Sequence, residues 1–253
     1  MDEMSPWRVE WLRLVRTRRL IALGGVFVFF GFIEPLGTYY LPDLLRHSAG
    51  GLKIVIPRPV PADGISSYAS NALLIGLIVM VFVAASACMV DARPALSAFY
   101  RTRTRDFWQL LYPRAAVAAC AGVGAYLLGL LCAWYETGVL IGAPGTAAMA
   151  ESAVLVSVYL VFAVAVTAAA STLARSTLAT AIWSIAFLLV ISVAAAVPQL
   201  KQWLPAALTD APDALVRHTA ALHYYLPAVA VCAVGMIGLV LAARWRGSSR
   251  EVS

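Results

Sequence analysis

The chain has 253 residues, of which 62% are hydrophobic and 13% charged, and its mean hydropathy is +0.82. A soluble domain carries about 25% charged and about 45–50% apolar residues, so this chain cannot cover a water-facing surface and is predicted to be an all-α integral membrane protein. The net charge of +6 gathers in a few segments between apolar runs, which indicates membrane topology rather than nucleic-acid binding. The four cysteines lie inside apolar runs without CxxC spacing, which favours packed thiols over disulfides or metal ligands.

Residues 1–19 are predicted to form an amphipathic helix that lies in the headgroup layer of a membrane. Trp7 and Trp11 recur at helical spacing on one apolar arc, and arginines fall opposite. Ser5 followed by Pro6 is a typical helix start, with a capping hydroxyl and then proline at the first helical position. A basic helix with tryptophans on its apolar face suits an anionic leaflet. The alternative is that this segment is only the positively charged flank of the first span.

Six apolar runs are long enough to cross a hydrocarbon core of about 30 Å. They cover residues 20–41, 72–90, 115–135, 152–174, 178–197 and 227–243. The first run is too long for a signal peptide, and further spans follow it. Toward its far end it carries Glu34 followed by Pro35. A carboxylate there lies either at the membrane interface or against a protein interior or water path, where it is usually functional.

The segments between the spans are predicted to be loops. Residues 42–70 form a polar connector rich in glycine and proline, with a short extended piece near residues 54–61. Residues 136–151 form a Gly/Pro turn, and residues 175–176 a tight turn. Residues 201–226 form a longer, mildly amphipathic loop.

Basic residues divide unequally between the two sides of the predicted bundle. The N-terminus, the segment 91–114, residue 175 and the C-terminal tail hold 14 of the 19 Lys and Arg residues, and the remaining connectors hold five. By the positive-inside rule, both termini and the segment 91–114 are expected in the cytoplasm. An even number of spans agrees with that topology.

The sequence contains no motif that indicates an enzyme. It lacks the GxxxxGK[ST] loop that cradles nucleotide phosphates, so ATP hydrolysis by that route is excluded. It has no GxSxG, and its histidines, His47, His218 and His223, fall in predicted loops. We therefore expect no catalytic residue, cofactor or metal in this chain.

Ion-coupled transport normally needs ionisable residues within the spans, and only Glu34 qualifies. The spans carry hydroxyl groups and small residues instead. These groups either line a path for an amphipathic solute or make ordinary interhelical hydrogen bonds. They include Thr38, Tyr39, Tyr40, Tyr126, Ser157, Tyr159, Thr167, Ser171 and Ser184.

The segment 91–114 is more structured than a plain connector needs to be. Its pattern predicts a short helix near its start, a basic linker, an interfacial helix over residues 107–112 and then the third span. A stop-transfer flank that only fixes topology would explain its five arginines. It would not explain Leu96, Phe99 and Tyr100, which are bulky residues of the kind that anchor a protein contact.

This arrangement resembles the permease subunits of ABC-2-type exporters: six spans, an N-terminal amphipathic helix, and a cytoplasmic helix between the second and third spans. The run RPALSAFYRTRTRDFWQLLYPR is similar to the corresponding loop of actinobacterial members. The connector 201–226 lies where that family often places outer-face helices. The chain departs from a common family pattern, a Glu followed at a distance by Gly, because it has Asp91 and no such Gly. The resemblance implies an exporter of a hydrophobic or amphipathic solute (a drug, lipid or peptide) in a bacterial cytoplasmic membrane.

The resemblance also implies partners. A separate ATP-binding cassette subunit would bind ATP and Mg, and a second permease chain, identical or different, would complete the complex. The coupling contact with the ATPase would fall on Arg93, Leu96, Phe99, Tyr100 and Arg101. The solute path would lie between permease chains along the first, second and fifth spans, with Glu34, Thr38 and Tyr39 as its candidate lining residues. The other two hypotheses are a membrane structural or assembly factor and an intramembrane enzyme.

Overall fold

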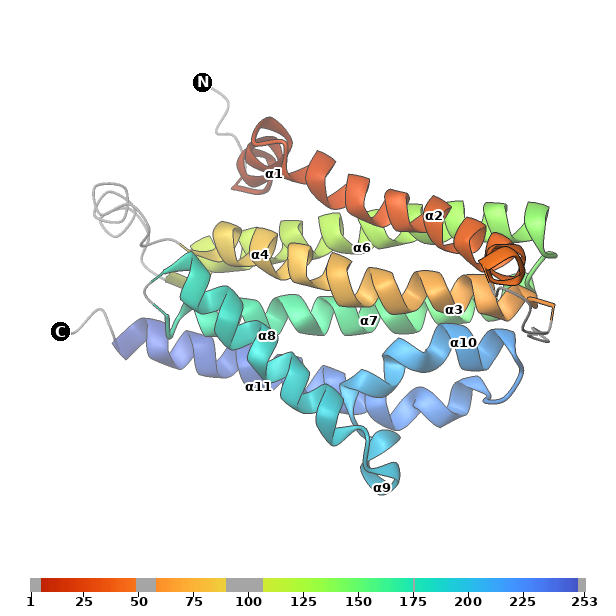
Figure 1. The fold of residues 1–253 in the computed structure, drawn as a ribbon. Helices are drawn as coiled ribbons and strands as arrows, with labels where there is room; N and C mark the ends of the chain where they lie inside the picture. Colours follow the sequence, from red (N-terminus) through yellow and green to blue (C-terminus); the bar gives the residue numbers. More distant parts are fainter. Residues whose placement is uncertain (1–5, 49–57, 90–106, 175, 250–253) are drawn as a thin grey trace.

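The computed structural model describes residues 6–48, 58–89, 107–174 and 176–249. In these ranges the regular structure is helical without any strand, and six helices are long and apolar enough to cross a membrane. The prediction of an all-α membrane protein with six transmembrane helices is confirmed. Figure 1 shows the long helices side by side in one bundle, with α1 and the end of α11 at the same end. We call this the termini end.

The chain enters the bundle through two helices joined by a tight turn. α1 (Pro6–Arg16) starts at the predicted proline, and α2 (Arg19–Ser48) is the first candidate span. Between them Thr17 donates its hydroxyl to the Arg13 carbonyl oxygen at 2.8 Å. Arg18 takes a φ of +56°, a left-handed conformation that is uncommon outside glycine and reverses the chain locally. The turn therefore sets α1 at an angle to the span that follows it, as Figure 1 shows.

The second span begins earlier in the chain than the hydropathy indicates. α3 (Pro61–Asn71), the π-helical turn η1 (Ala72–Gly76) and α4 (Leu77–Cys88) follow one another without a break. The predicted polar loop over residues 42–70 is therefore wrong from Pro61 onward, and it is also wrong over residues 42–48, where α2 continues. Proline suits the first helical position, and the Asp63 carboxylate accepts the N–H of the capping residue at 2.9 Å. The serines and glycine of α3 lower its hydropathy, but most of the helix packs against other helices rather than lipid.

The third and fourth spans are also longer than predicted. α6 (Phe107–Leu140) includes the interfacial helix predicted at residues 107–112, but that helix is not separate because α6 continues through Pro113. α7 (Thr146–Ser171) follows after a short turn, so the predicted Gly/Pro turn is confined to its middle part. Gly142 in that turn has a φ of +147°, which residues with a side chain rarely adopt.

The fifth span, α8 (Thr177–Ala194), follows the capping residue Ser176, whose hydroxyl accepts the Ala179 N–H at 3.2 Å. The predicted loop over residues 201–226 is largely helical, at the end of the bundle opposite to the termini. Its short helices are α9 (Pro198–Lys201), η2 (Pro205–Asp210), α10 (Ala211–Val216) and η3 (Leu222–Tyr225). They lead into α11 (Leu226–Ser249), whose first part belongs to the sixth candidate span.

The core lies where α2, α3, α4, α6 and α7 meet. At its centre Tyr68 stacks on Tyr126 with ring centroids 5.8 Å apart, and its hydroxyl donates to the Tyr126 carbonyl oxygen at 2.8 Å. In the second and fourth spans, 56% and 61% of the most apolar stretch is buried inside the protein. In the first, fifth and sixth spans the buried share is only 22%, 22% and 17%. These three spans therefore present their apolar side chains outward, to lipid or to another membrane protein.

Candidate functional site

The residues that sequence reasoning assigned to an ATPase contact are not placed by the structure. Arg93, Leu96, Phe99, Tyr100 and Arg101 all lie outside the described residues. The end of their segment is described, because α6 begins at Phe107 and carries Arg114 in its second turn. The structure also shows which helix contacts the start of α6, namely α1.

The start of α6 is joined to α1 by a shielded ion pair. The Arg114 Nε donates to the Glu10 Oε1 at 2.9 Å, with only 4% of the arginine and 13% of the glutamate side chain exposed. Arg13 pairs with the same carboxylate at 3.5 Å, and Arg19 also lines this junction. Removing one partner from such a buried pair typically costs about 3–5 kcal/mol, because the other charge is left without compensation. The ion pair thus holds α1 on the helix that follows the segment 91–106.

The apolar arc predicted on α1 lies partly against the bundle and partly on the surface. Leu14 is buried against the bundle, whereas Trp7 and Trp11 are each 44% exposed. Trp7 also meets Tyr112 edge to face, with ring centroids 5.6 Å apart. Exposed tryptophans on a basic helix at the end of a span suit the headgroup layer.

A polar strip runs between α2 and α3 on the half of the bundle away from the termini. The Thr38 hydroxyl lies 3.1 Å from the Ser67 hydroxyl and donates to the Glu34 carbonyl oxygen at 2.9 Å. The Glu34 side chain, half-buried, shares a hydrogen bond with Asn71. The strip thus pairs positions i and i+4 of one helix with positions i and i+4 of the other.

Of the predicted path residues, Glu34 and Thr38 share this strip, but Tyr39 does not. Tyr39 is 40% exposed and packs on Tyr40 with ring centroids 5.0 Å apart. The strip ends at Asn71, where the π-helical turn η1 begins. Turns of this type often mark functional positions in helices. Sequence reasoning missed the two α3 members, although their spacing of four was visible, because the segment was assigned to a loop.

Four of the nine hydroxyl-bearing residues named for the spans bind within their own helix. Ser157, Thr167, Ser171 and Ser184 each donate to a carbonyl oxygen three or four residues earlier, at 2.6–2.8 Å. The expectation of ordinary interhelical hydrogen bonding is therefore wrong for these four. An intrahelical bond satisfies the hydroxyl without a partner helix. Tyr159 is different, because its side chain shares a hydrogen bond with Ser192 of α8.

Tyr159 and Ser192 lie in a cavity of about 330 Å³ between the second, fourth and fifth spans. Its walls are mostly leucine and isoleucine, and its polar groups include Ser70 and Asp210. Small-molecule sites commonly have this character, with apolar walls of about 300–1,000 Å³ and a few polar groups. Lys201 holds Asp210 at 2.7 Å, and this hydrogen bond raises the pKa of the lysine. The arrangement suits an amphipathic molecule whose polar part faces the end away from the termini.

Among the described residues, no group of three or more His, Cys, Asp or Glu side chains could hold a metal ion. At the end away from the termini, Arg217 pairs with both Asp63 and Asp213. This bridge fastens α10 to the first turn of α3. It is a structural tie, since all three side chains are at least a third exposed and engaged with one another.

The chain is similar in sequence to a known membrane protein. No family model matches the chain, and no solved structure matches it. An uncharacterized transmembrane protein of Bacillus subtilis (strain 168), YxlG, is 22% identical over 219 residues, which cover 85% of each chain. The chain is thus similar over most of its length to another transmembrane protein.

Proposed function

We propose that this chain is the membrane-spanning subunit of an ABC-type exporter in a bacterial cytoplasmic membrane, with both termini in the cytoplasm. It would move a hydrophobic or amphipathic solute, driven by ATP hydrolysis on a separate subunit. The observation that carries the proposal is the buried ion pair between Glu10 and Arg114. It ties the interfacial helix to the end of the basic segment assigned to the ATPase contact.

The ion pair supports a route for force from an ATPase to the spans. Because Glu10 and Arg114 are shielded from water, α1 and the start of α6 resist separation and move together. A displacement of the segment 91–106 would reach α6 directly and α1 through this pair. Through the turn at Thr17 and Arg18, the displacement of α1 would then move α2, which carries one side of the polar strip.

The cavity between the second and fifth spans supports the choice of solute. Its apolar walls would bind a hydrocarbon body, and its polar groups at one end would orient a head. The exposed apolar faces of α2 and α8 leave room for a second permease chain, identical or different. A membrane assembly factor without transport is the competing function.

Purification of the tagged full chain from its native host tests the proposal. We expect a nucleotide-binding ATPase to copurify. The double variant Phe99→Ala with Tyr100→Ala should lose the ATPase while still inserting in the membrane, because its contact side chains are gone. The matched control is Leu200→Ala with Trp203→Ala, which removes two exposed apolar side chains at the other end. Absence of any ATPase from the wild-type preparation would refute the exporter, and equal copurification of both double variants would refute the contact site.

A further inference from the structure

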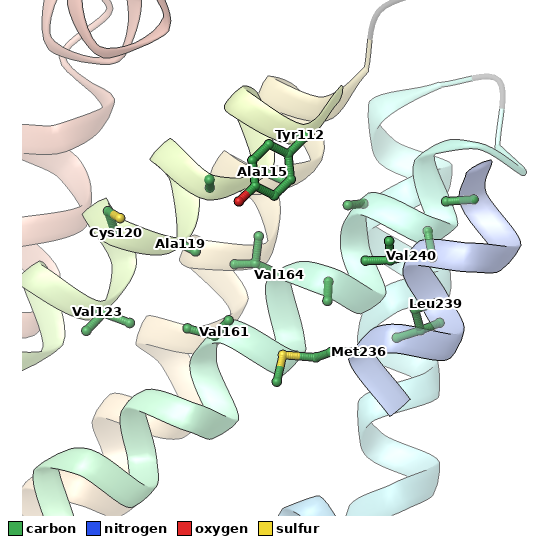
Figure 2. Close-up of a pocket in the computed structure, with 15 residues that line it drawn as sticks. Tyr112, Ala115, Ala119, Cys120, Val123, Val161, Val164, Met236, Leu239 and Val240 are labelled. Carbon is green, nitrogen blue, oxygen red and sulfur yellow. The ribbon is translucent and has the colours of Figure 1, made fainter. Parts of the chain in front are cut away.

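A second hollow lies in the half of the bundle near the termini. It is a groove of about 470 Å³ between α6, α7 and α11, and Figure 2 shows side chains of all three helices around it. Its volume falls within the range of about 300–1,000 Å³ that is usual for small-ligand sites. It shares no lining residue with the cavity at Tyr159.

Small side chains keep this groove open. Seven of its lining residues are alanines, namely Ala115, Ala116, Ala119, Ala165, Ala168, Ala169 and Ala243. Because alanine ends at Cβ, three helices in contact leave unfilled space between them. The other lining residues are apolar apart from Tyr112 and Cys120. The groove therefore offers hydrocarbon contacts along its length and a hydroxyl at the turn of α6 nearest the termini end.

Basic residues lie near the end of the groove that faces the termini end of the bundle. Arg244 is exposed and directly follows the lining residue Ala243. Tyr112, also exposed, carries Trp7 of the basic helix α1 on its ring. The sequence segments that flank the spans at this end hold 14 of the 19 basic residues. Each basic residue near an anionic lipid surface contributes about 1 kcal/mol of attraction.

We propose that this groove binds one acyl chain of an anionic glycerophospholipid from the leaflet at the termini end. The tail lies between α6, α7 and α11, and the headgroup lies at the level of Tyr112 and Arg244. A second protein helix fits less well, because a single helical turn about 10 Å wide and 5.4 Å long already fills roughly 420 Å³. The groove thus matches a flexible chain in volume, and the exposed Arg244 beside the lining residue Ala243 matches an anionic head. The site is independent of whether the protein transports a solute.

The test uses the full chain in vesicles that contain phosphatidylglycerol with a photoreactive diazirine in one acyl chain. Crosslinked peptides are mapped by mass spectrometry. We expect crosslinks to concentrate on residues 112–123, 161–169 and 236–243, and to exceed those from an equivalent phosphatidylcholine probe. Crosslinks spread evenly over the exposed faces of α2 and α8 would overturn the proposal. The wild-type measurement decides this without any variant.

Two variants separate the tail contact from the head contact. Ala165→Trp fills the groove and should lower crosslinking about tenfold, whereas Ala186→Trp, at an exposed position on α8, should leave it unchanged. Arg244→Gln should lower the preference for phosphatidylglycerol over phosphatidylcholine by about fivefold and keep the mapped positions. Undiminished crosslinking in a folded Ala165→Trp variant would overturn the groove as the site. A disulfide between two copies at Cys120 with no lipid crosslink would show a protein interface instead.

Discussion

Substitution of Gly129 by alanine should loosen the contact between α2 and α6. A Cβ at this position would lie 2.4 Å from the Phe27 carbonyl oxygen and 2.5 Å from the Tyr68 hydroxyl. The Phe27 oxygen belongs to the backbone and cannot rotate away. The approach is reciprocal, since a Cβ on Gly31 of α2 would lie 2.4 Å from the Gly129 carbonyl oxygen. Small residues at such crossings let helix backbones come close in membranes.

The expected loss of stability follows from these contacts. Overpacking of a well-filled interior costs about 1–3 kcal/mol. Displacement of the Tyr68 hydroxyl from the Tyr126 carbonyl oxygen, now 2.8 Å away, removes a hydrogen bond of about 1 kcal/mol net. Alanine in place of glycine returns about 1 kcal/mol of helix propensity. The free energy of unfolding of Gly129→Ala should therefore fall by about 1–3 kcal/mol.

The assay is an SDS titration of the purified chain in mixed micelles, with helix content and tryptophan fluorescence as independent probes. The matched control is Gly124→Ala on the same helix, where a Cβ would meet no atom within 4 Å. The control should be neutral or more stable by up to about 1 kcal/mol. If the two variants unfold alike, the close approach of α2 and α6 at Gly129 does not limit stability, and the reasoning is wrong.

Three further predictions follow from the charged residues. Arg114→Gln should lower the free energy of unfolding by about 3–5 kcal/mol, and the Arg114→Gln, Glu10→Gln double variant should recover part of that loss in a double-mutant cycle, because it removes a shielded charge that is left with only the more exposed Arg13. Arg217→Gln should cost less than about 1 kcal/mol, since its ion pairs are solvent-exposed; a loss as large as that of Arg114→Gln would contradict the role given to burial. In a cysteine-free background, Arg16→Cys and Gln202→Cys should react with an impermeant maleimide from opposite sides of the membrane; labelling of both from one side would contradict the six-span topology.

Hydropathy located the spans well where the helices face lipid and poorly where they face one another. α8 lies close to its predicted bounds and α2 begins within a residue of its predicted start, because their exposed side chains are those that hydropathy detects. α2 nevertheless continues to Ser48, past its predicted end at residue 41. α3 was assigned to a loop because its serines and glycine lower its hydropathy, although Gly64 and most of the helix pack against neighbouring helices. The interfacial helix predicted at residues 107–112 is not separate from the third span, because α6 continues through Pro113.

The sequence by itself determined that the chain is a helical membrane protein with six spans. These properties are local sums of hydropathy along the chain, and each residue contributes without reference to distant ones. Only the tertiary structure paired Glu10 with a residue 104 positions away, placed Glu34 against Asn71, and left a groove between α6, α7 and α11. Such contacts depend on the rotation and stagger of whole helices, which are set by close packing at positions such as Gly31 and Gly129.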